Sequence, residues 1–216
     1  YECNIKKYNY INREFEKCGY IGNKINIEQH FKVCGLSQYK CLFCDKNILQ
    51  MDIEEHAINN CKIRFEKYQN GDKYFGGKKN NLKEGYVIYM YANGGRYKGG
   101  FKNDKKEGFG IEYCSNGDIY YGEFNNGLRE GFGILSLYPY LTLYQGEFKN
   151  DFRDGCGVLF FLNGGRYEGE FKNNKIEGYG FDYFSDGSKY IGEFKNAMRE
   201  GFGICYYSNG DRYIGI

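Results

Sequence analysis

The stretch Tyr97-Lys98-Gly99-Gly100-Phe101, followed by Glu107-Gly108-Phe109-Gly110, decides the fold because its pattern recurs along most of the chain. The equivalent tyrosines follow one another every 23 residues, with a single step of 24 residues, at Tyr74, Tyr97, Tyr120, Tyr144, Tyr167, Tyr190 and Tyr213. Self-similarity at a short fixed period indicates an array in which each unit packs only on its neighbours.

Counting each tyrosine as position 0, position 2 is always Gly, position 6 always Asn, position 10 always Glu or Asp and position 11 always Gly. Position 4 is Phe in five of the six complete copies, with Lys78 as the exception, and position 13 is Gly except at Val87. Positions 0, 2 and 4 share one face of a strand, so a glycine lies between two rings and leaves room for them. Positions 12, 14 and 16 are mostly apolar and predict a second strand.

Turn signals separate these strands. The run from Asn at position 6 to Glu-Gly at positions 10 and 11 predicts the loop of each hairpin. Asn-Gly and Asp-Gly pairs, such as Asn116-Gly117 and Asp186-Gly187, predict the turn into the next hairpin. Tyr138-Pro139-Tyr140 breaks the pattern in the third copy and predicts a local irregularity there.

This pattern closely resembles the MORN repeat, over residues 74–216, with six complete copies and a seventh begun. The resemblance implies a mainly β fold, in which antiparallel hairpins follow one another in a single-layer solenoid. A single sheet has no second layer to cover its aromatic stripe. Each ring by itself is expected to pack in a core, but the stripe as a whole is expected to form an exposed partner groove. The groove residues are Tyr97, Phe101, Tyr120, Phe124, Tyr144, Phe148, Tyr167, Phe171, Tyr190 and Phe194.

Three rows of charge run beside the aromatic stripe. Glutamates occupy position 3, lysines position 5, and Lys or Arg position 9 in most copies. A solvated face of balanced cross-strand pairs is the simpler interpretation. The alternative is a basic strip that binds phosphoinositide headgroups at a membrane surface.

The first 61 residues contain six of the nine cysteines and both histidines of the chain. Cys41-Leu-Phe-Cys44, followed by His56 and Cys61, has the spacing of a tetrahedral zinc site, and Asp52 and Glu55 predict a capped helix carrying His56. A second, less regular set precedes it. The complete set of predicted zinc ligands is Cys3, Cys18, His30, Cys34, Cys41, Cys44, His56 and Cys61.

Cys18, His30 and Cys34 repeat the spacing of Cys44, His56 and Cys61, but Phe15 stands where the fourth ligand is expected. Cys3 is the remaining candidate for this fourth ligand. The order of these ligands closely resembles the tandem TRAF-type zinc finger. The resemblance implies protein–protein contact. We therefore expect zinc fingers over residues 1–61, two structural Zn²⁺ ions, a linker over residues 62–73, and MORN repeats over 74–216.

Composition and motifs argue against two classes of function, nucleic-acid binding and catalysis. The formal net charge is only +2, which argues against a nucleic-acid partner. If zinc holds both histidines with four protein ligands, no open catalytic position remains, and no phosphate-binding Gly-rich motif followed by Lys-Ser/Thr occurs. The chain begins at Tyr1 and ends inside a repeat, so we interpret it as part of a longer protein, and a catalytic domain elsewhere stays open.

The expected function is therefore a non-catalytic scaffold that binds protein partners through the repeat groove and the zinc fingers. The alternative is a phosphoinositide or membrane-surface module of a larger signalling protein, and a homodimer is also left open. Reduced metal-binding thiolates predict a cytoplasmic protein. The resemblance to MORN proteins implies association with the cytoskeleton or the cell cortex.

Overall fold

A computed structural model describes residues 38–40, 47–49, 64–140 and 142–215, and within these ranges all regular structure is β-strand. The chain divides into two compact units between Ser115 and Asn116. The first contains the short antiparallel pair β1 (Gln38–Lys40) and β2 (Asn47–Leu49), and the first repeats, whose strands are β3 (Arg64–Lys67), β4 (Lys73–Lys79), β5 (Leu82–Met90), β6 (Arg96–Lys102) and β7 (Lys105–Tyr113).

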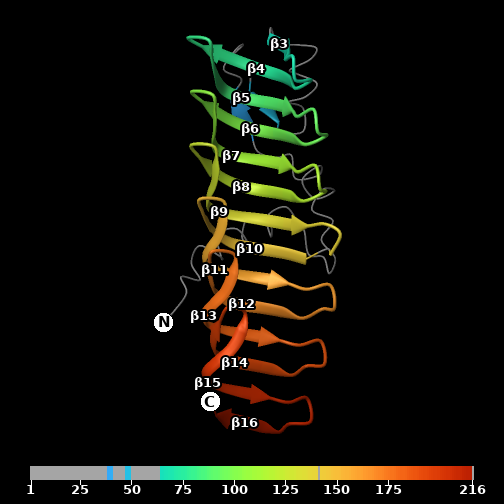
Figure 1. Ribbon diagram of the computed structural model, residues 1–216, viewed down its shortest axis with the longest axis vertical. Helices are drawn as coiled ribbons and strands as arrows, with labels where there is room; N and C mark the ends of the chain where they lie inside the picture. The colour runs from blue at the N-terminus through green and yellow to red at the C-terminus, as the bar shows by residue number, and fades with distance from the viewer. Residues whose placement is uncertain (1–37, 41–46, 50–63, 141, 216) are drawn as a thin grey trace. The chain divides into compact units, whose positions relative to one another are not determined.

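The second unit contains nine further strands, which are β8 (Ile119–Asn125), β9 (Leu128–Leu137), β10 (Thr142–Lys149), β11 (Phe152–Phe160), β12 (Arg166–Lys172), β13 (Lys175–Tyr183), β14 (Lys189–Lys195), β15 (Met198–Tyr206) and β16 (Arg212–Gly215). From β3 to β7 and from β8 to β16, each strand pairs antiparallel with the next strand of the sequence, as the stacked arrows of Figure 1 show. Each unit is therefore a meander of hairpins, which confirms the mainly β fold and the open antiparallel sheet.

The turn inside each hairpin is shorter than the sequence predicted. Lys102 pairs with Lys105, so only Asn103 and Asp104 form the loop, and both have positive φ (49° and 65°). Two consecutive residues with positive φ are typical of the type I′ turn, whose twist matches that of paired strands. Asn tolerates this conformation better than most residues, which explains the invariant Asn at position 6. The second strand begins again at position 8, inside the predicted loop.

The turns between hairpins use the predicted Asn-Gly and Asp-Gly pairs in a longer loop. In one example Phe161 N–H bonds to the Gly165 carbonyl oxygen, and Gly164 N–H bonds back to the Phe161 carbonyl oxygen. Gly164 has φ +88°, and the Asn163 side chain accepts a hydrogen bond from Gly165 N–H at 3.0 Å. The pair thus supplies a residue with positive φ together with a side chain that caps the loop.

A β-bulge in every complete hairpin creates the space for the tyrosine ring. The register shifts after position 2, for example between Gly146 and Phe148 in the pair β10–β11. Gly146 pairs with Gly157, and the Tyr144 ring lies over both: a Cβ built on Gly157 would meet the ring at 2.5 Å. The two glycines are therefore required by the close approach of the ring.

The core of each unit is made of these rings. The tyrosines at position 0 from Tyr74 to Tyr190 are at most 5% exposed, and the phenylalanines at position 4 at most 8%. In β8–β16 the rings alternate edge to face along the sheet. Tyr144, for example, lies 5.3 Å from Phe148 of its own hairpin and 4.9 Å from Phe171 of the next. Such offset geometry is favourable for aromatic pairs.

One boundary differs from the prediction, and one predicted irregularity is present. The segment 62–73, expected to be a linker, contains β3, which pairs with β4 from Arg64↔Gly76 to Lys67↔Lys73, so the sheet begins before Tyr74. The irregularity at Tyr138-Pro139-Tyr140 is confirmed. Strand β9 is ten residues long, one more than the other second strands of complete hairpins, and the Tyr138–Pro139 peptide is cis.

Candidate protein-binding face

The two faces of each sheet differ in chemistry. We call the side on which the position-0 rings lie the tyrosine face, and the other side the opposite face. Each buried tyrosine of the tyrosine face donates a hydrogen bond from its hydroxyl to the carbonyl oxygen of position 3, as Tyr120 does to Glu123 at 2.9 Å. Position 3 faces the bulged segment of the second strand, and its carbonyl is the acceptor that a buried hydroxyl needs.

Cations at position 9 cover these rings. The guanidinium of Arg129 lies 4.8 Å from the Tyr120 ring centroid, that of Arg199 lies 4.6 Å from Tyr190, and the Lys106 ammonium lies 5.0 Å from Tyr97. These distances are typical of cation–π contacts. The fifth copy carries Ile176 at this position, so Tyr167 lacks the cation that covers its neighbours.

The ten residues predicted to line an exposed groove are brought together in line within each unit, but they do not face solvent. They are Tyr97, Phe101, Tyr120, Phe124, Tyr144, Phe148, Tyr167, Phe171, Tyr190 and Phe194, and all are buried. The expectation of an exposed stripe was wrong in this respect, because the bulges let the rings sink onto the glycine pairs and the position-9 cations lie over them. A binding role for this face stays a prediction.

The glutamates of position 3 have a structural role that the sequence did not reveal. The Glu147 side chain lies against Gly155, which has φ +109°, and its carboxylate accepts a hydrogen bond from Cys156 N–H at 3.2 Å. Glu123 accepts one from Phe132 N–H at 3.3 Å. The row therefore satisfies a backbone amide left unpaired by the bulge.

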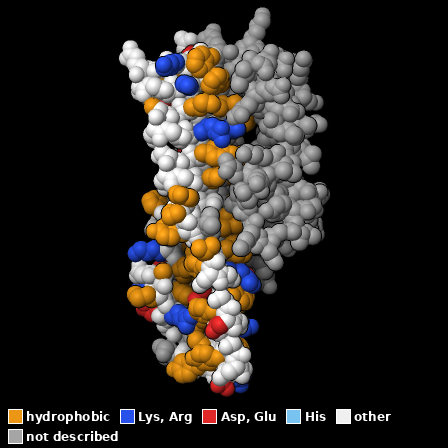
Figure 2. Space-filling view, turned by 90° about the vertical axis from the view of Figure 1, so that its right-hand side faces the viewer, with side chains coloured by type: hydrophobic (Ala, Val, Ile, Leu, Met, Phe, Trp, Pro, Cys, Tyr) orange, Lys and Arg blue, Asp and Glu red, His pale blue; other side chains and the backbone are white. Residues whose placement is uncertain are grey.

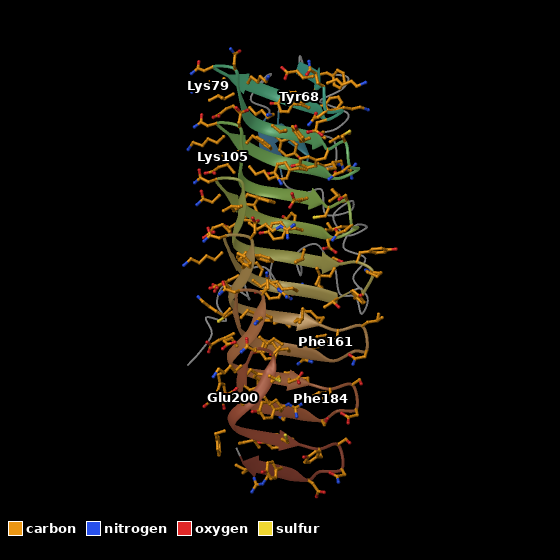
Figure 3. All side chains as sticks on the ribbon, in the orientation of Figure 1. Tyr68, Lys79, Lys105, Phe161, Phe184 and Glu200 are labelled. Atoms are coloured by element: carbon orange, nitrogen blue, oxygen red, sulfur yellow. The ribbon has the colours of Figure 1, made fainter. Side chains whose placement is uncertain are left out.

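The acids of position 10 and the lysines of position 5 join neighbouring hairpins. Asp154 accepts hydrogen bonds from Asn173 N–H at 3.3 Å and from the Lys172 ammonium at 3.2 Å, both in the next copy. Within a single hairpin, Lys195 lies 3.4 Å from Glu200. These contacts match the simpler interpretation of the charged rows as balanced pairs. They lie on the edge of the two-residue turns, where Figure 3 labels Lys79 and Lys105.

Two groups of solvent-exposed apolar side chains bear on binding. On the tyrosine face they lie at the edge of the Asn-Gly turns, where Phe161 and Phe184 are each 37% exposed. Figure 3 labels both on the same edge, and Figure 2 looks onto this edge and shows hydrophobic side chains along it, mixed with charged ones. On the opposite face, Phe109 is 55% exposed and Phe202 53%.

A hollow of about 560 Å³ opens on the tyrosine face between β11 and β15. Leu159, Phe171 and Ile176 contribute apolar wall, and Phe161 and Phe184 come from the adjoining turns. Arg153 and Asp182 also line it. Burial raises the pKa of the Asp182 carboxyl, a shift opposed by its hydrogen bond with Arg199, whose guanidinium nitrogen lies 3.5 Å away.

The predicted metal ligands lie outside the described residues. They are Cys3, Cys18, His30, Cys34, Cys41, Cys44, His56 and Cys61. Among residues that the structure does describe, no group of three or more His, Cys, Asp or Glu side chains could hold a metal ion. No helix in the same part of the chain has the length and apolar character that a membrane span requires.

The chain matches one protein family and resembles several solved structures at low sequence identity. No curated protein matches the chain. The TCP domain of Drosophila melanogaster SAS-4, solved with a proline-rich motif of Ana2, is 16% identical, with a TM-score of 0.41, over 73% of this chain and 92% of that one. The wild-type TCP10 domain of Danio rerio CPAP is 14% identical, with a TM-score of 0.44, over 70% and 72% of the two chains.

The family match is far more specific than these structural likenesses. The MORN repeat description matches six consecutive segments, which are residues 74–96, 97–119, 120–138, 144–166, 167–189 and 190–212. The third segment is the shortest and ends where Tyr138 departs from the repeat. The buried Tyr, the paired glycines and the positive-φ Asn of each hairpin account for the residues that recur in these segments. The chain belongs to the MORN repeat family.

Proposed function

We propose that this chain is a non-catalytic adaptor that binds a partner polypeptide on the tyrosine face of its repeats. The observation that carries the proposal is the hollow between β11 and β15, where partly exposed rings adjoin a preformed apolar wall. A concave, mostly apolar surface with a few polar groups is typical of binding sites. The interlocked rings beneath it hold the wall rigid, so little conformational entropy is lost when a partner binds.

The charge arrangement supports a protein partner over a phosphoinositide headgroup. Arg129 and Arg199 of position 9 lie over tyrosine rings, and Lys172 and Lys195 of position 5 have acidic partners within the chain. A lipid headgroup would have to compete with these contacts. The membrane-surface function remains the second candidate, and it predicts binding that weakens steeply with salt.

Two further parts of the proposal concern the rest of the chain and its setting. Zinc fingers over residues 1–61, with two structural Zn²⁺ ions, would supply a second protein-binding module, because cysteine and histidine are suitable ligands for tetrahedral zinc. The setting we propose is a cytoplasmic assembly of the cytoskeleton or of a membrane surface. Its support is the family resemblance alone.

The experiment compares matched substitutions on the two faces. The full chain is immobilised, and captured proteins are identified for wild type, Phe161→Ser with Phe184→Ser, and Phe109→Ser with Phe202→Ser. Capture should be lost only in the first variant, since its two rings adjoin the hollow. Loss confined to the second variant would move the interface to the opposite face. Salt-sensitive sedimentation with phosphoinositide vesicles, in the absence of protein capture, would favour the membrane function.

A further inference from the structure

The cation row of the tyrosine face is interrupted at one place in the second unit. Arg153 and Arg199 lie one copy before and one copy after Ile176, which takes the cation's position. Arg199 has an acidic partner, Asp182, at 3.5 Å, and its guanidinium also lies 4.9 Å from the Phe184 ring centroid. The interruption leaves an apolar side chain in the wall of the hollow, directly after the turn that follows β12.

Among the residues that the structure describes, Arg153 has no acidic partner, unlike Arg199. Its guanidinium donates one hydrogen bond to the Asn174 carbonyl oxygen at 2.7 Å and lies over the rings of Tyr144 and Phe171, whose centroids are 5.5 and 5.7 Å away. Burial lowers the pKa of this guanidinium, but an arginine remains protonated in proteins. It therefore carries a charge that is partly desolvated and not neutralised by a carboxylate.

Such a group gains strongly from an external carboxylate. A guanidinium has five N–H donors in a planar fork, which suits bidentate binding of a carboxylate, and only one of them is used here. A charge-assisted hydrogen bond is stronger in a partly buried site than in water. Beside it, Ile176, Leu159 and the rings of Phe161 and Phe184 offer contact for an apolar side chain.

We propose that the hollow between β11 and β15 binds an acidic–apolar segment of a partner polypeptide, with an Asp or Glu carboxylate on Arg153 and a neighbouring aliphatic or aromatic side chain on Ile176. The occupant is a carboxylate rather than a cationic segment because the unpaired charge in the hollow is positive. Asp182 does not reverse this preference, since Arg199 already pairs with it. This inference rests on the proposed function, and it names the partner chemistry of the same site.

The test selects short random peptides on the immobilised full chain and titrates the enriched sequences by calorimetry. Enriched peptides should combine an acidic residue with a nearby Leu, Ile or Phe. Affinity should fall at least about tenfold in Arg153→Gln, which keeps a polar side chain but removes its charge and its guanidinium fork. It should also fall in Ile176→Arg, which restores a cation at the interrupted position and fills the hollow. Lys189→Gln is the matched control, because it removes a charge that lies over Tyr206, away from the hollow.

The outcomes separate the two proposals. Peptides that bind equally to wild type, Arg153→Gln and Ile176→Arg would overturn the assignment of the hollow while leaving a protein-binding function in place. If no peptide is enriched above background on either the wild-type chain or the Lys189→Gln chain, both the assignment of the hollow and the protein-binding function are overturned. Replacing the peptide's Glu by Gln should abolish the effect of Arg153→Gln. A peptide that binds only with phosphoserine in place of Glu would overturn the carboxylate assignment. Circular dichroism of each variant confirms that the sheet is intact.

Discussion

The hydroxyl of Tyr144 donates a hydrogen bond to the carbonyl oxygen of Glu147 at 2.9 Å, across the bulge of its own hairpin. The ring is fully buried, and burial raises the pKa of the phenol well above its usual value. The same tyrosine stacks under Arg153 and packs edge to face on two phenylalanines. One residue therefore joins the bulge, the core and the wall of the hollow.

We expect Tyr144→Phe to lower the free energy of unfolding by about 1 kcal/mol, since it removes one buried hydrogen bond while keeping the ring. Urea unfolding followed by circular dichroism measures the change. Tyr140→Phe is the control, because Tyr140 is 73% exposed, and it should have no effect. Equal stability of Tyr144→Phe and wild type would show that the hydroxyl contributes nothing to the fold.

The paired glycines should tolerate no side chain. A Cβ on Gly146 would lie 2.6 Å from the Gly157 Cα and 2.6 Å from the Cys156 carbonyl oxygen, both of which are backbone atoms that cannot move alone. We expect Gly146→Ala to cost about 3 kcal/mol. Gly164→Ala, at φ +88° with nothing within 4 Å, should cost only about 1 kcal/mol of backbone strain. Denaturant midpoints compare them, and a reversed order would contradict the packing of the ring on the glycine pair.

These residues show which parts of the structure the sequence could predict. The alternation of Tyr, Gly and Phe at positions 0, 2 and 4 predicted the strands and their shared face, because side-chain direction follows directly from strand geometry. The hairpin register could not be predicted. The bulge after Gly146 shifts it, and a bulge changes how many residues face one another without leaving a simple signal in the alternation.

The candidate site could be predicted only in part from the sequence. The aromatic stripe pointed to the tyrosine face, where the hollow lies, but its rings proved to be covered. Contacts such as Arg153 on Tyr144 depend on residues nine positions apart being brought together by the hairpin. The signal that could have found the hollow is the single Ile176 in an otherwise basic column. The role of Glu147 on Cys156 N–H also depends on the bulge, so its row was interpreted only as surface charge.

A turn residue offers a stabilising change. Ala197 has φ 65°, at a position where the other copies carry Asn, Asp or Gly. Because an L-residue with a Cβ is strained there, we expect Ala197→Gly to raise the free energy of unfolding by about 1 kcal/mol. Ala92 lies in a turn without positive φ. Ala92→Gly should therefore lower the free energy of unfolding, by about half of the gain expected for Ala197→Gly. Thermal midpoints of the two variants should therefore move in opposite directions, and a fall in both would contradict the strain at Ala197.

The hydrogen bonds of Asp72 lead us to expect that the stability of the first unit depends on pH. Its carboxylate accepts hydrogen bonds from Ala92 N–H and the Tyr89 hydroxyl, each at 2.8 Å, and the first of these is the largest cause that holds the pKa of Asp72 below its usual 3.8. A carboxyl with a lowered pKa stabilises the fold above the pKa of the unfolded chain, and this stabilisation is lost as the pH falls through the folded pKa. The stability gap between wild type and Asp72→Asn should therefore shrink below about pH 4, and a gap that is constant with pH would contradict this assignment.

Zinc in residues 1–61 is tested by metal content and by selective unfolding. Cysteine and histidine ligands in a closed site supply much of the folding energy of so small a domain, so a chelator should unfold this region while the strands from β3 onward keep their circular dichroism. Metal analysis should give about two zinc ions per chain. Cys41→Ser should remove one of them, whereas Cys205→Ser, at a thiol of β15 that is free in the structure, should remove none. A single zinc ion in the wild type would exclude Cys3 as a ligand, and a chain without zinc would overturn both sites.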